Sequence, residues 1–240
     1  MVQVLVLAGG LGTRLWPRTA IAPKALVPVA GRPFAEHQVE LLAARGVDDI
    51  VFAIAYRGDM IRRALRDGES WGVRIRYSDE GTDLRGTGGA VRLFAASALA
   101  DETFAVLYGD SYLPIDYADV WRAYGRCGLP ALMTVLQNRD RWDTSNAVFG
   151  PDGRLRYRKG AGGRGGMTHI DYGLSIVARD LVLERVAPDS ASDLADLFAE
   201  LGERGELAGH EVTERFYEIG SDQGLEELDE LLAGNAGAVQ

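Results

Sequence analysis

The feature of this sequence that most constrains its fold is an apolar run that breaks abruptly into glycines. Residues 2–7, VQVLVL, are rich in valine and leucine, and the segment AGGLGTR follows at 8–14. A short, almost continuously apolar run predicts a strand buried on both faces of a parallel sheet. Glycines directly after such a strand let backbone N–H groups converge and let a ligand approach closely. The start of the chain therefore predicts a phosphate-binding turn at the end of a central strand.

Strands and helices alternate through the first half of the chain. After the first strand, further strands are expected at 49–55, 73–78 and 103–108. Helices are expected between them, at 33–45, 59–66 and 90–100. This alternating order predicts an α/β fold with a Rossmann-like, mostly parallel mixed sheet flanked by helices.

The second half has a more mixed pattern. We expect helices at 117–126, 193–204 and 221–232, and strands at 131–137, 169–178, 206–211 and 215–219. Apolar segments on either side of the turn Pro-Asp-Gly predict a hairpin at 145–149 and 154–159. The run GAGGRGG at 160–166 is either a flexible linker or a mobile lid. No clean domain boundary is visible.

Composition and charge exclude several classes of protein. The 240 residues carry a net charge of −9, which argues against a nucleic-acid-binding surface because such surfaces are basic. No apolar run approaches the roughly 20 residues that span a membrane. The single cysteine, Cys127, excludes an internal disulfide and a cysteine-based metal cluster. Because the sequence shows no signal-peptide pattern, we expect a cytoplasmic protein that binds neither nucleic acid nor membrane. The sequence does not distinguish a monomer from a homo-oligomer.

Two common glycine-loop patterns do not fit the glycines at the start of the chain. A Walker A loop ends in Lys-Ser or Lys-Thr, and neither pair follows these glycines. A dinucleotide-binding fingerprint needs a third glycine three residues after Gly12, where Leu15 stands. The sequence therefore argues against a P-loop NTPase and against a nicotinamide-dependent oxidoreductase.

The pattern that is present reads LAGGLGTRLWP at 7–17 and PKALVPVAGRP at 23–33. It resembles the signature of the sugar-1-phosphate nucleotidyltransferases. Further matches follow in order along the whole chain: GTGG at 86–89, YGD at 108–110, RK at 158–159, DYG at 171–173 and EIGS at 218–221. The segments GTDLRGTGGA, GDSYLP and IDYGLSIV look most like bacterial D-glycero-D-manno-heptose 1-phosphate guanylyltransferases.

The resemblance implies a GT-A-like nucleotidyltransferase fold, with a smaller β-rich part that binds the sugar. We expect a single domain over 1–240, in which 1–110 is the NTP-binding half and 111–240 is the sugar-phosphate-binding half. The implied reaction transfers a nucleoside monophosphate from an NTP to a sugar 1-phosphate and releases pyrophosphate. Positioning and charge neutralisation carry such chemistry.

The same resemblance assigns roles to individual residues. Arg14, Lys24 and Asp110 are the implied catalytic residues, and the two cations would neutralise charge on the phosphates. The implied nucleotide-binding residues are Leu7, Ala8, Gly9, Gly10, Gly12, Thr13, Glu80, Thr87 and Gly88.

Mg²⁺ is the implied cofactor. Asp110 matches the family's metal-binding aspartate, and carboxylate oxygens are ligands that Mg²⁺ prefers. Glu218 stands where the family usually has a second aspartate, and Asp222 is the rival candidate for that role.

The base and the sugar are less strongly specified. A carboxylate at Glu80 can accept hydrogen bonds from guanine N1–H and N2–H, which adenine does not offer, so GTP is favoured. Lys159 matches the family lysine that contacts the phosphate of the sugar. The family often has Glu-Lys here, and this chain has Arg158 before the lysine, which argues against a plain glucose acceptor. The other candidates for the sugar phosphate are Ser111, Asn146 and Asp171.

We therefore expect an enzyme that resembles sugar-1-phosphate guanylyltransferases, with a heptose 1-phosphate as the favoured acceptor. One alternative is a nucleotidyltransferase that acts on a hexose 1-phosphate, such as mannose or glucose 1-phosphate, with another NTP. The other is a catalytically silent regulatory protein that binds sugar nucleotides. The presence of Arg14, Lys24 and Asp110 argues against the silent protein.

Overall fold

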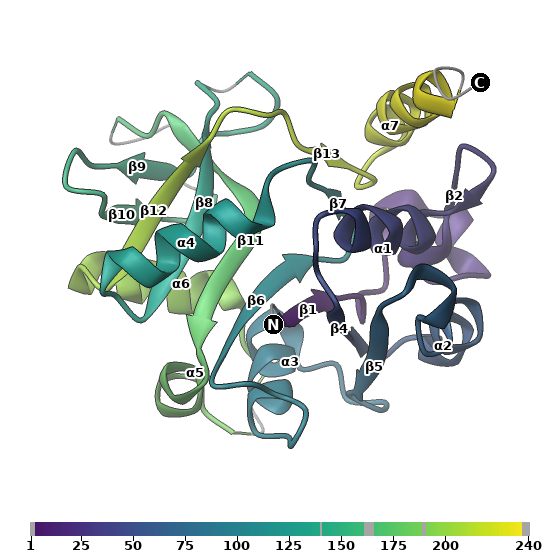
Figure 1. Cartoon of the computed structure of the whole chain (residues 1–240), viewed down its shortest axis with the longest axis horizontal. Helices are drawn as coiled ribbons and strands as arrows, with labels where there is room; N and C mark the ends of the chain where they lie inside the picture. The colour runs from purple at the N-terminus through teal and green to yellow at the C-terminus, as the bar shows by residue number, and fades with distance from the viewer. Residues whose placement is uncertain (1–2, 140, 161–165, 189–190, 237–240) are drawn as a thin grey trace.

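The computed structural model of the chain describes residues 3–139, 141–160, 166–188 and 191–236. A nine-stranded sheet forms its centre, in the order β10-β9-β11-β6-β1-β4-β5, and β8 and β12 continue the sheet beside β11 (Figure 1). The strands are β1 (Gln3–Leu7), β4 (Asp49–Ile54), β5 (Arg74–Asp79), β6 (Thr103–Tyr108), β8 (Ala131–Gln137), β9 (Ala147–Phe149), β10 (Leu155–Tyr157), β11 (His169–Ala178) and β12 (Leu207–Val212). Strands β6, β1, β4 and β5 are parallel, and β11 runs antiparallel to both β6 and β8. The mixed sheet predicted from the sequence is confirmed.

Helices cover both faces of this sheet. They are α1 (Phe34–Ala44), α2 (Gly58–Leu65), α3 (Gly86–Ala95), α4 (Tyr117–Cys127), α5 (Arg179–Arg185), α6 (Leu194–Arg204) and α7 (Asp222–Ala236). Helices α1, α2 and α4 pack on one face, and α3, α5 and α6 on the other. Strand β1 serves both layers, because Val4 and Val6 point to the first and Leu5 to the second. A strand buried on both faces is expected to be almost wholly apolar, which is what residues 2–7 predict; the exception, Gln3, is buried with its amide donating to Asp49 Oδ2 at 2.8 Å.

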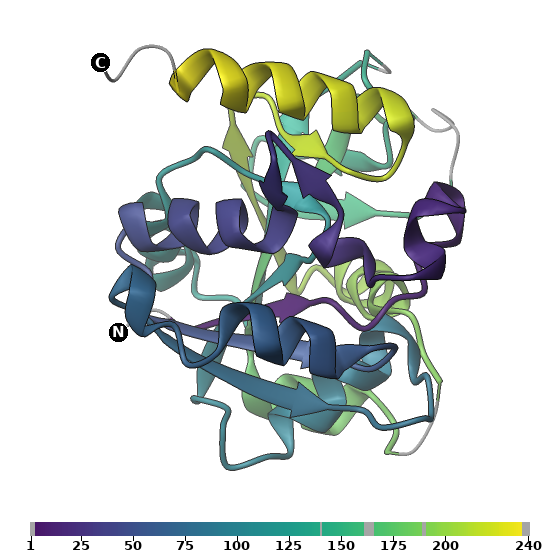
Figure 2. The same cartoon turned by 90° about the vertical axis from the view of Figure 1, so that its right-hand side faces the viewer.

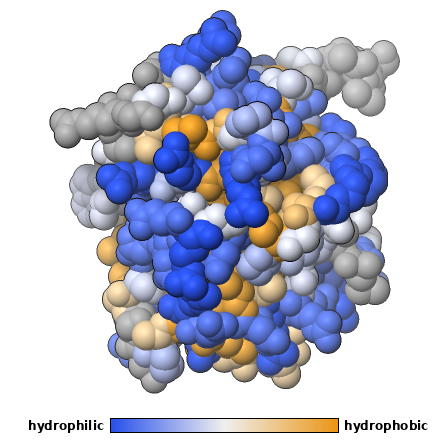
Figure 3. Space-filling view, turned by 90° about the vertical axis from the view of Figure 1, so that its left-hand side faces the viewer, coloured by the Kyte–Doolittle hydropathy of each residue, from blue (hydrophilic) through white to orange (hydrophobic). Residues whose placement is uncertain are grey.

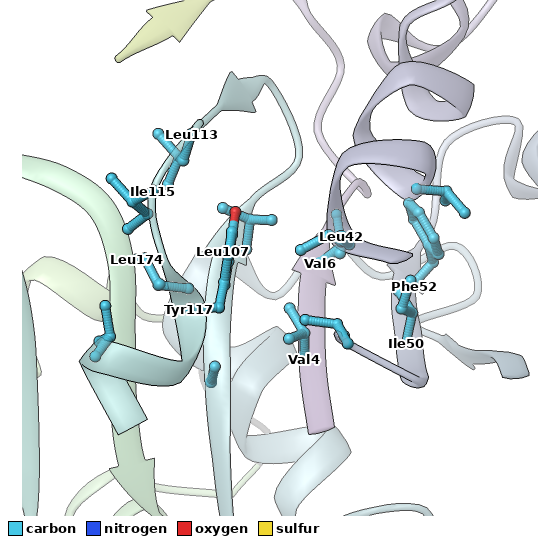
Figure 4. Close-up of a cluster of buried hydrophobic side chains, with 14 of the residues drawn as sticks. Val4, Val6, Leu42, Ile50, Phe52, Leu107, Leu113, Ile115, Tyr117 and Leu174 are labelled. Carbon is cyan, nitrogen blue, oxygen red and sulfur yellow. The ribbon is translucent and has the colours of Figure 1, made fainter. Parts of the chain in front are cut away.

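The first core layer lies between the sheet and α1, α2 and α4. Figure 4 shows Val4 and Val6 of β1 near Leu42 of α1, with Leu107 of β6 and Tyr117 of α4 further along the same layer. All five side chains are buried. This layer fixes β1 and β6 against each other, and the carboxyl ends of these two strands carry the candidate site.

Two short ribbons and a third, smaller core lie at one end of the molecule. Strand β2 (Pro28–Val29) pairs with β3 (Arg32–Pro33), and β7 (Ser111–Tyr112) pairs with β13 (Tyr217–Glu218). Helix α7 lies across this end (Figure 2). The third core joins α7 to the segment after β1, and its buried members are Leu15, Val27, Val29, Phe34, Ile219, Leu225 and Leu228. The last helix therefore packs on the motif that opens the chain.

Several element boundaries differ from those predicted. Helix α3 begins at Gly86 and ends at Ala95, so the glycine cluster lies inside its first turn and not before it. Strand β13 covers only Tyr217–Glu218 of the predicted strand at 215–219, and helix α5 was not predicted. Of the glycine run at 160–166, residues 161–165 lie outside the described residues.

The outer surface is mainly polar on the side where β9, β10 and β12 lie. Figure 3 shows hydrophilic residues over most of this face, with apolar residues visible in narrow areas between them. Among the described residues, no helix combines the length and the apolar character that crossing a membrane requires.

Candidate active site

A cavity of about 400 Å³ opens at the carboxyl ends of β1 and β6, which are parallel neighbours in the sheet. Ligands of open α/β sheets bind at this edge, and the volume falls within the roughly 300–1,000 Å³ of small-molecule sites. Many residues predicted from the sequence line it: Leu7, Ala8, Gly9, Gly10, Gly12, Thr13, Arg14, Lys24, Glu80, Thr87 and Asp110. Gly86, Tyr108 and Gly109, which belong to the motifs GTGG and YGD, also line it, together with residues outside those motifs that include Ala25, Ala53, Leu84 and Ala90.

Gly9 allows the loop after β1 to lie directly against Glu80. A methyl group on Gly9 would come within 2.7 Å of Glu80 Oε1 and 3.2 Å of Ala55 Cβ, so no larger residue fits without displacing them. Glu80 Oε2 accepts the backbone N–H of Arg85 at 3.2 Å. Burial raises the pKa of Glu80, against the lowering effect of that N–H. Glu80 is therefore a desolvated acceptor on the cavity wall, and it gains from a ligand that donates hydrogen bonds.

Two cations and two carboxylates gather at the cavity: Arg14, Lys24 and Asp110 line it, and Glu218 lies beside them. Lys24 Nζ lies 2.5 Å from Asp110 Oδ2. Burial raises the pKa of Glu218, and the charge of Asp110 raises it further, whereas Lys24 and Arg14 lower it. A methyl group on Gly220 would lie 3.1 Å from Glu218 Oε1 and 3.5 Å from Arg14 Nη2, which places these two side chains close together. The four charged groups thus form one cluster.

Glu218 lies beside Asp110 because β13 pairs with β7. In this ribbon Glu218 is opposite Ser111, and the N–H of Ile219 donates to the carbonyl oxygen of Asp110 at 2.9 Å. Asp222, the rival metal ligand, is exposed and pairs with Arg18 at 3.3 Å. The structure thus couples Glu218, rather than Asp222, to Asp110.

The number of acidic ligands in the cluster limits what the protein can offer a metal. Within the described residues, no group of three or more His, Cys, Asp or Glu side chains gathers in a way that could hold an ion. Asp110 and Glu218 would supply two carboxylate ligands. Mg²⁺ is commonly bound by one or two carboxylates together with water and the phosphates of the substrate, so this pair fits such an ion.

Thr87 and Gly88 have different surroundings although they are adjacent. Thr87 lines the cavity. Gly88 is buried and does not line it, and its N–H donates to the carbonyl oxygen of Ser192 at 2.9 Å. In this structure Gly88 serves the contact between α3 and the segment before α6.

Three of the sugar-phosphate candidates gather next to the cavity. The N–H of Asp171 donates to Asn146 Oδ1 at 2.9 Å, and the hydroxyl of Tyr108 lies 3.4 Å from Asp171 Oδ2. Ser111 Oγ would lie 3.2 Å from a methyl group on Gly173. Tyr108 also lines the cavity, so it connects the predicted nucleotide side to the predicted sugar side. The sequence motif Tyr-Gly-Asp at 108–110 contains the signal for Tyr108, although the prediction drew only Asp110 from it.

The fourth candidate, Lys159, forms an ion pair with Asp193, which the sequence did not single out. Lys159 also acts electrostatically on Asp171. Burial raises the pKa of Asp171 from 3.8 to about 6, against the lowering effects of the Gly173 N–H, the Tyr108 hydroxyl and Lys159. A buried carboxyl with a raised pKa beside a cavity is typical of functional sites.

The fold and the site together define a class of protein. A glycine loop, two cations and paired carboxylates at the carboxyl edge of a mostly parallel sheet are suited to a phosphate-bearing ligand. Residues 3–146 match the family model described as nucleotidyl transferase, and the chain belongs to this family.

Curated relatives extend the comparison. A mannose-1-phosphate guanyltransferase from Emericella nidulans is 47% identical over 112 residues, which cover 45% of this chain and 30% of that protein. A UTP–glucose-1-phosphate uridylyltransferase from Synechocystis is 32% identical over 144 residues, which cover 56% of this chain and 37% of that protein. The chain therefore spans about a third of the length of the curated relatives it matches.

Solved structures share the fold over nearly the whole chain. HddC from Yersinia pseudotuberculosis superimposes with a TM-score of 0.78 at 22% identity, covering 97% of this chain and 100% of that one. A second structure of HddC, a complex with GMP-PN, gives a TM-score of 0.77 at the same identity and coverage. The nucleotidyltransferase fold predicted from the sequence is confirmed by the family match and by these neighbours.

Proposed function

We propose that the chain transfers GMP from GTP to a heptose 1-phosphate. An oxygen of the sugar phosphate forms a bond to the α-phosphorus, and the bond from that phosphorus to the β-phosphate oxygen breaks. The products are a GDP-sugar and pyrophosphate. The observation that carries this proposal is a cavity at the sheet edge that the glycine loop, Arg14, Lys24 and Asp110 all line. Its support from outside the chain is the family match and the nucleotidyltransferases among the relatives.

The cationic wall is suited to the triphosphate. Arg14 and Lys24 would neutralise charge on the α-phosphate and on the departing pyrophosphate, and fixed charges in a partly desolvated site act more strongly than in water. Lys24 now pairs with Asp110 at 2.5 Å. A bound phosphate offers this ammonium a second anionic partner, so Lys24 can hold Asp110 and the triphosphate together.

Asp110 and Glu218 would hold Mg²⁺. Two neighbouring carboxylates, one with its pKa raised by burial and by the other's charge, gain from a cation between them. When bound, the ion supplies charge neutralisation at the phosphates of the substrate.

Glu80 supports a guanine base. Its carboxylate is desolvated on the cavity wall and has only one hydrogen bond from Arg85 in the described structure. Guanine offers N1–H and N2–H to such a group, and adenine offers neither. The guanyltransferases among the relatives and the GMP-PN complex of HddC agree with this choice.

The sugar side would use Lys159 for the phosphate and Asn146, Asp171 and Ser111 for hydroxyl groups. The preference for a heptose rests on the segments GTDLRGTGGA, GDSYLP and IDYGLSIV, which resemble those of heptose 1-phosphate guanylyltransferases. It also rests on Arg158, which stands in place of the family's glutamate. Mannose-1-phosphate guanyltransferases and a glucose-1-phosphate uridylyltransferase among the relatives make a hexose 1-phosphate the specific alternative.

The test is a matrix of the four common NTPs against hexose and heptose 1-phosphates, read out as pyrophosphate release with Mg²⁺ present. We expect GTP with a heptose 1-phosphate to give the highest kcat/KM. Preference for a hexose or another NTP would overturn the substrate assignment, and no release with any pair would favour the silent regulatory protein.

Three variants test the assigned machinery. Asp110→Asn should lower kcat by about 100-fold or more, since it removes charge stabilisation at the reacting phosphates. Glu218→Gln should also lower kcat, whereas Asp222→Asn should leave it within about threefold, because Asp222 pairs with Arg18 away from the cluster. Normal turnover by Asp110→Asn would refute the proposed mechanism.

A further inference from the structure

The chain contains 26 basic residues, and only two of them, Lys24 and Lys159, are lysines. Lys24 lines the cavity and pairs with Asp110, whereas Lys159 does not line it and pairs with Asp193, which is bonded to the cavity-lining Thr87. Lysine is a compact charge on a flexible stem, whereas arginine is a rigid planar fork. A flexible cation needs a partner to hold it in place before a ligand arrives. Asp110 already has a proposed role, but Asp193 has none.

We propose that Asp193 is a positioning residue, which holds the ammonium group of Lys159 at the edge of the cavity, where the phosphate of the sugar 1-phosphate binds. This inference rests on the proposed function, because it takes the sugar 1-phosphate as the ligand. Three features of the structure support it: the bonds that hold Asp193, the backbone contacts that fix the segment around it, and the lack of other described partners for the Lys159 ammonium group.

Asp193 uses its two carboxylate oxygens for different partners. Oδ2 binds the ammonium group of Lys159. Oδ1 accepts the hydroxyl of Thr87 at 2.9 Å and the backbone N–H of Ala195 at 3.0 Å, where it caps helix α6. Thr87 lines the cavity, so Lys159 is separated from a cavity-lining residue by a single carboxylate group. Partial burial opposes ionisation, but the bonds from Lys159, Ala195 and Thr87 lower the pKa of Asp193 and keep it charged.

The backbone next to Asp193 is fastened to the first turn of α3. The N–H of Ser192 donates to the carbonyl oxygen of Arg85, and the carbonyl oxygen of Ser192 accepts the N–H of Gly88, both at 2.9 Å. The N–H of Leu194 donates to Thr87 Oγ1 at 2.9 Å. A methyl group on Gly88 would lie 2.6 Å from Ser192 Oγ, so the glycine is what permits this approach. Asp193 is therefore fixed relative to the cavity wall.

Lys159, by contrast, has little local support. It follows β10, lies next to Gly160, and its side chain is 64% exposed. Within the described part of the chain, Asp193 is the one residue that binds its ammonium group. Fixing a free lysine side chain costs up to about 2 kcal/mol of rotamer entropy. A lysine that is already held meets part of this cost before the phosphate binds, which raises affinity for the phosphate.

The decisive variant is Asp193→Asn, because asparagine caps a helix as well as aspartate does and can still accept from Thr87. It therefore removes the charge and keeps the local structure. With the NTP and sugar 1-phosphate that give the highest activity, we expect KM for the sugar 1-phosphate to rise about tenfold, with kcat and KM for the NTP within about threefold. An unchanged or lower KM for the sugar 1-phosphate would overturn the inference.

A double-mutant cycle separates this role from a merely structural one. If Asp193 acts through Lys159, then Asp193→Asn combined with Lys159→Met should be no worse than Lys159→Met alone. Additive losses would mean that Asp193 acts independently of Lys159, and the inference would fail. The matched control is Glu203→Gln, which breaks the exposed ion pair between Glu203 and Arg158, the residue before Lys159. This control should leave both KM values unchanged.

A second measurement does not depend on activity. The two lysines can be acetylated by pulse labelling and followed separately by mass spectrometry, with Lys24 as the internal reference. Asp193→Asn should speed the labelling of Lys159 severalfold and leave that of Lys24 unchanged, and equal rates would refute the restraint. If the wild-type protein releases no pyrophosphate, the proposed function fails, and the labelling alone then decides whether Asp193 restrains Lys159.

Discussion

The charge of Asp171 should lower the stability of the folded protein at neutral pH. Its carboxyl is mostly buried behind the cavity, and burial raises its pKa from 3.8 to about 6. Each pKa unit corresponds to about 1.4 kcal/mol, so the charged side chain costs the folded state about 3 kcal/mol. Total stabilities of single domains are roughly 5–15 kcal/mol, so this cost is a large fraction. Asp171→Asn should therefore stabilise the protein.

The pH dependence gives the sign of the effect. The folded protein binds the proton of Asp171 more tightly than the unfolded chain does, so between pH 3.8 and about 6 the folded state holds more protons. Wild-type stability is unaffected by this group below that window and falls as pH rises through it. Asparagine has no charge to lose: its oxygen can still accept the Gly173 N–H, and its amide can donate to the Tyr108 hydroxyl. The advantage of the variant should be near zero at pH 4 and about 2–3 kcal/mol at pH 7.5.

Urea unfolding followed by tryptophan fluorescence at several pH values between about 3 and 8 measures this difference. Asp49→Asn provides a control of opposite sign. Asp49 is buried too, but the bonds from Gln3, Arg76 and Arg74 outweigh burial and lower its pKa. That variant should lose stability at pH 7.5, and the loss should shrink as the pH falls below 3.8. A pH-independent difference for Asp171→Asn, or a less stable variant at pH 7.5, would refute the reasoning.

Two further predictions concern packing. Gly88→Ala should lower the unfolding free energy by about 1–3 kcal/mol, because the added methyl group would lie 2.6 Å from Ser192 Oγ. The control Gly125→Ala, in open space on α4, should raise the unfolding free energy by about 0.5–1 kcal/mol, because alanine is a better helix former than glycine. A stabilised Gly88→Ala would contradict the packing of α3 on Ser192. Leu228→Ala should lower the unfolding free energy, measured in urea, by about 2–5 kcal/mol, because Leu228 is fully buried in the third core. It should also lower kcat, because this core holds Leu15 and Ile219 beside the charged cluster. An unchanged kcat would show that this core does not position the site.

The sequence predicted the buried strands best. The observed bounds of β6, β8 and β11 coincide with the predicted ranges 103–108, 131–137 and 169–178. Each is a largely apolar run, and a strand that is buried on both faces leaves this signal at most of its positions. The sequence pattern and the tertiary structure select the same residues in these strands, so the local pattern is enough to predict their bounds.

Helix α3 shows where local reasoning fails. Glycine is a poor helix former, so the sequence favours a helix that begins after the cluster at 86–89. The helix instead begins at Gly86, because its first turn lies against Ser192, a contact that only small residues allow. The partner is about a hundred residues away in the sequence, and no local pattern reports it.

The same limit applies to the candidate site. The glycine loop and its cations could be recognised because they follow one strand within a short segment. Asp193 could not, since its position beside Thr87 depends on how α6 packs on α3. The sequence does show that the chain has only two lysines. The second, Lys159, forms the ion pair through which the structure identifies Asp193.

The third core explains how two distant parts of the sequence meet at the site. Arg14 and Glu218 are about two hundred residues apart, yet each directly precedes a buried residue of this core, Leu15 and Ile219. Helix α7 completes the core with Leu228 and is also tied to the opening motif by Asp229, which accepts the N–H of Ala30 at 2.6 Å. A shift of α7 would therefore move Arg14 and Glu218 together. The last helix, although it contributes no residue to the cavity wall among those described, sets the geometry of the charged cluster, and its packing should be as sensitive to substitution as the cluster itself.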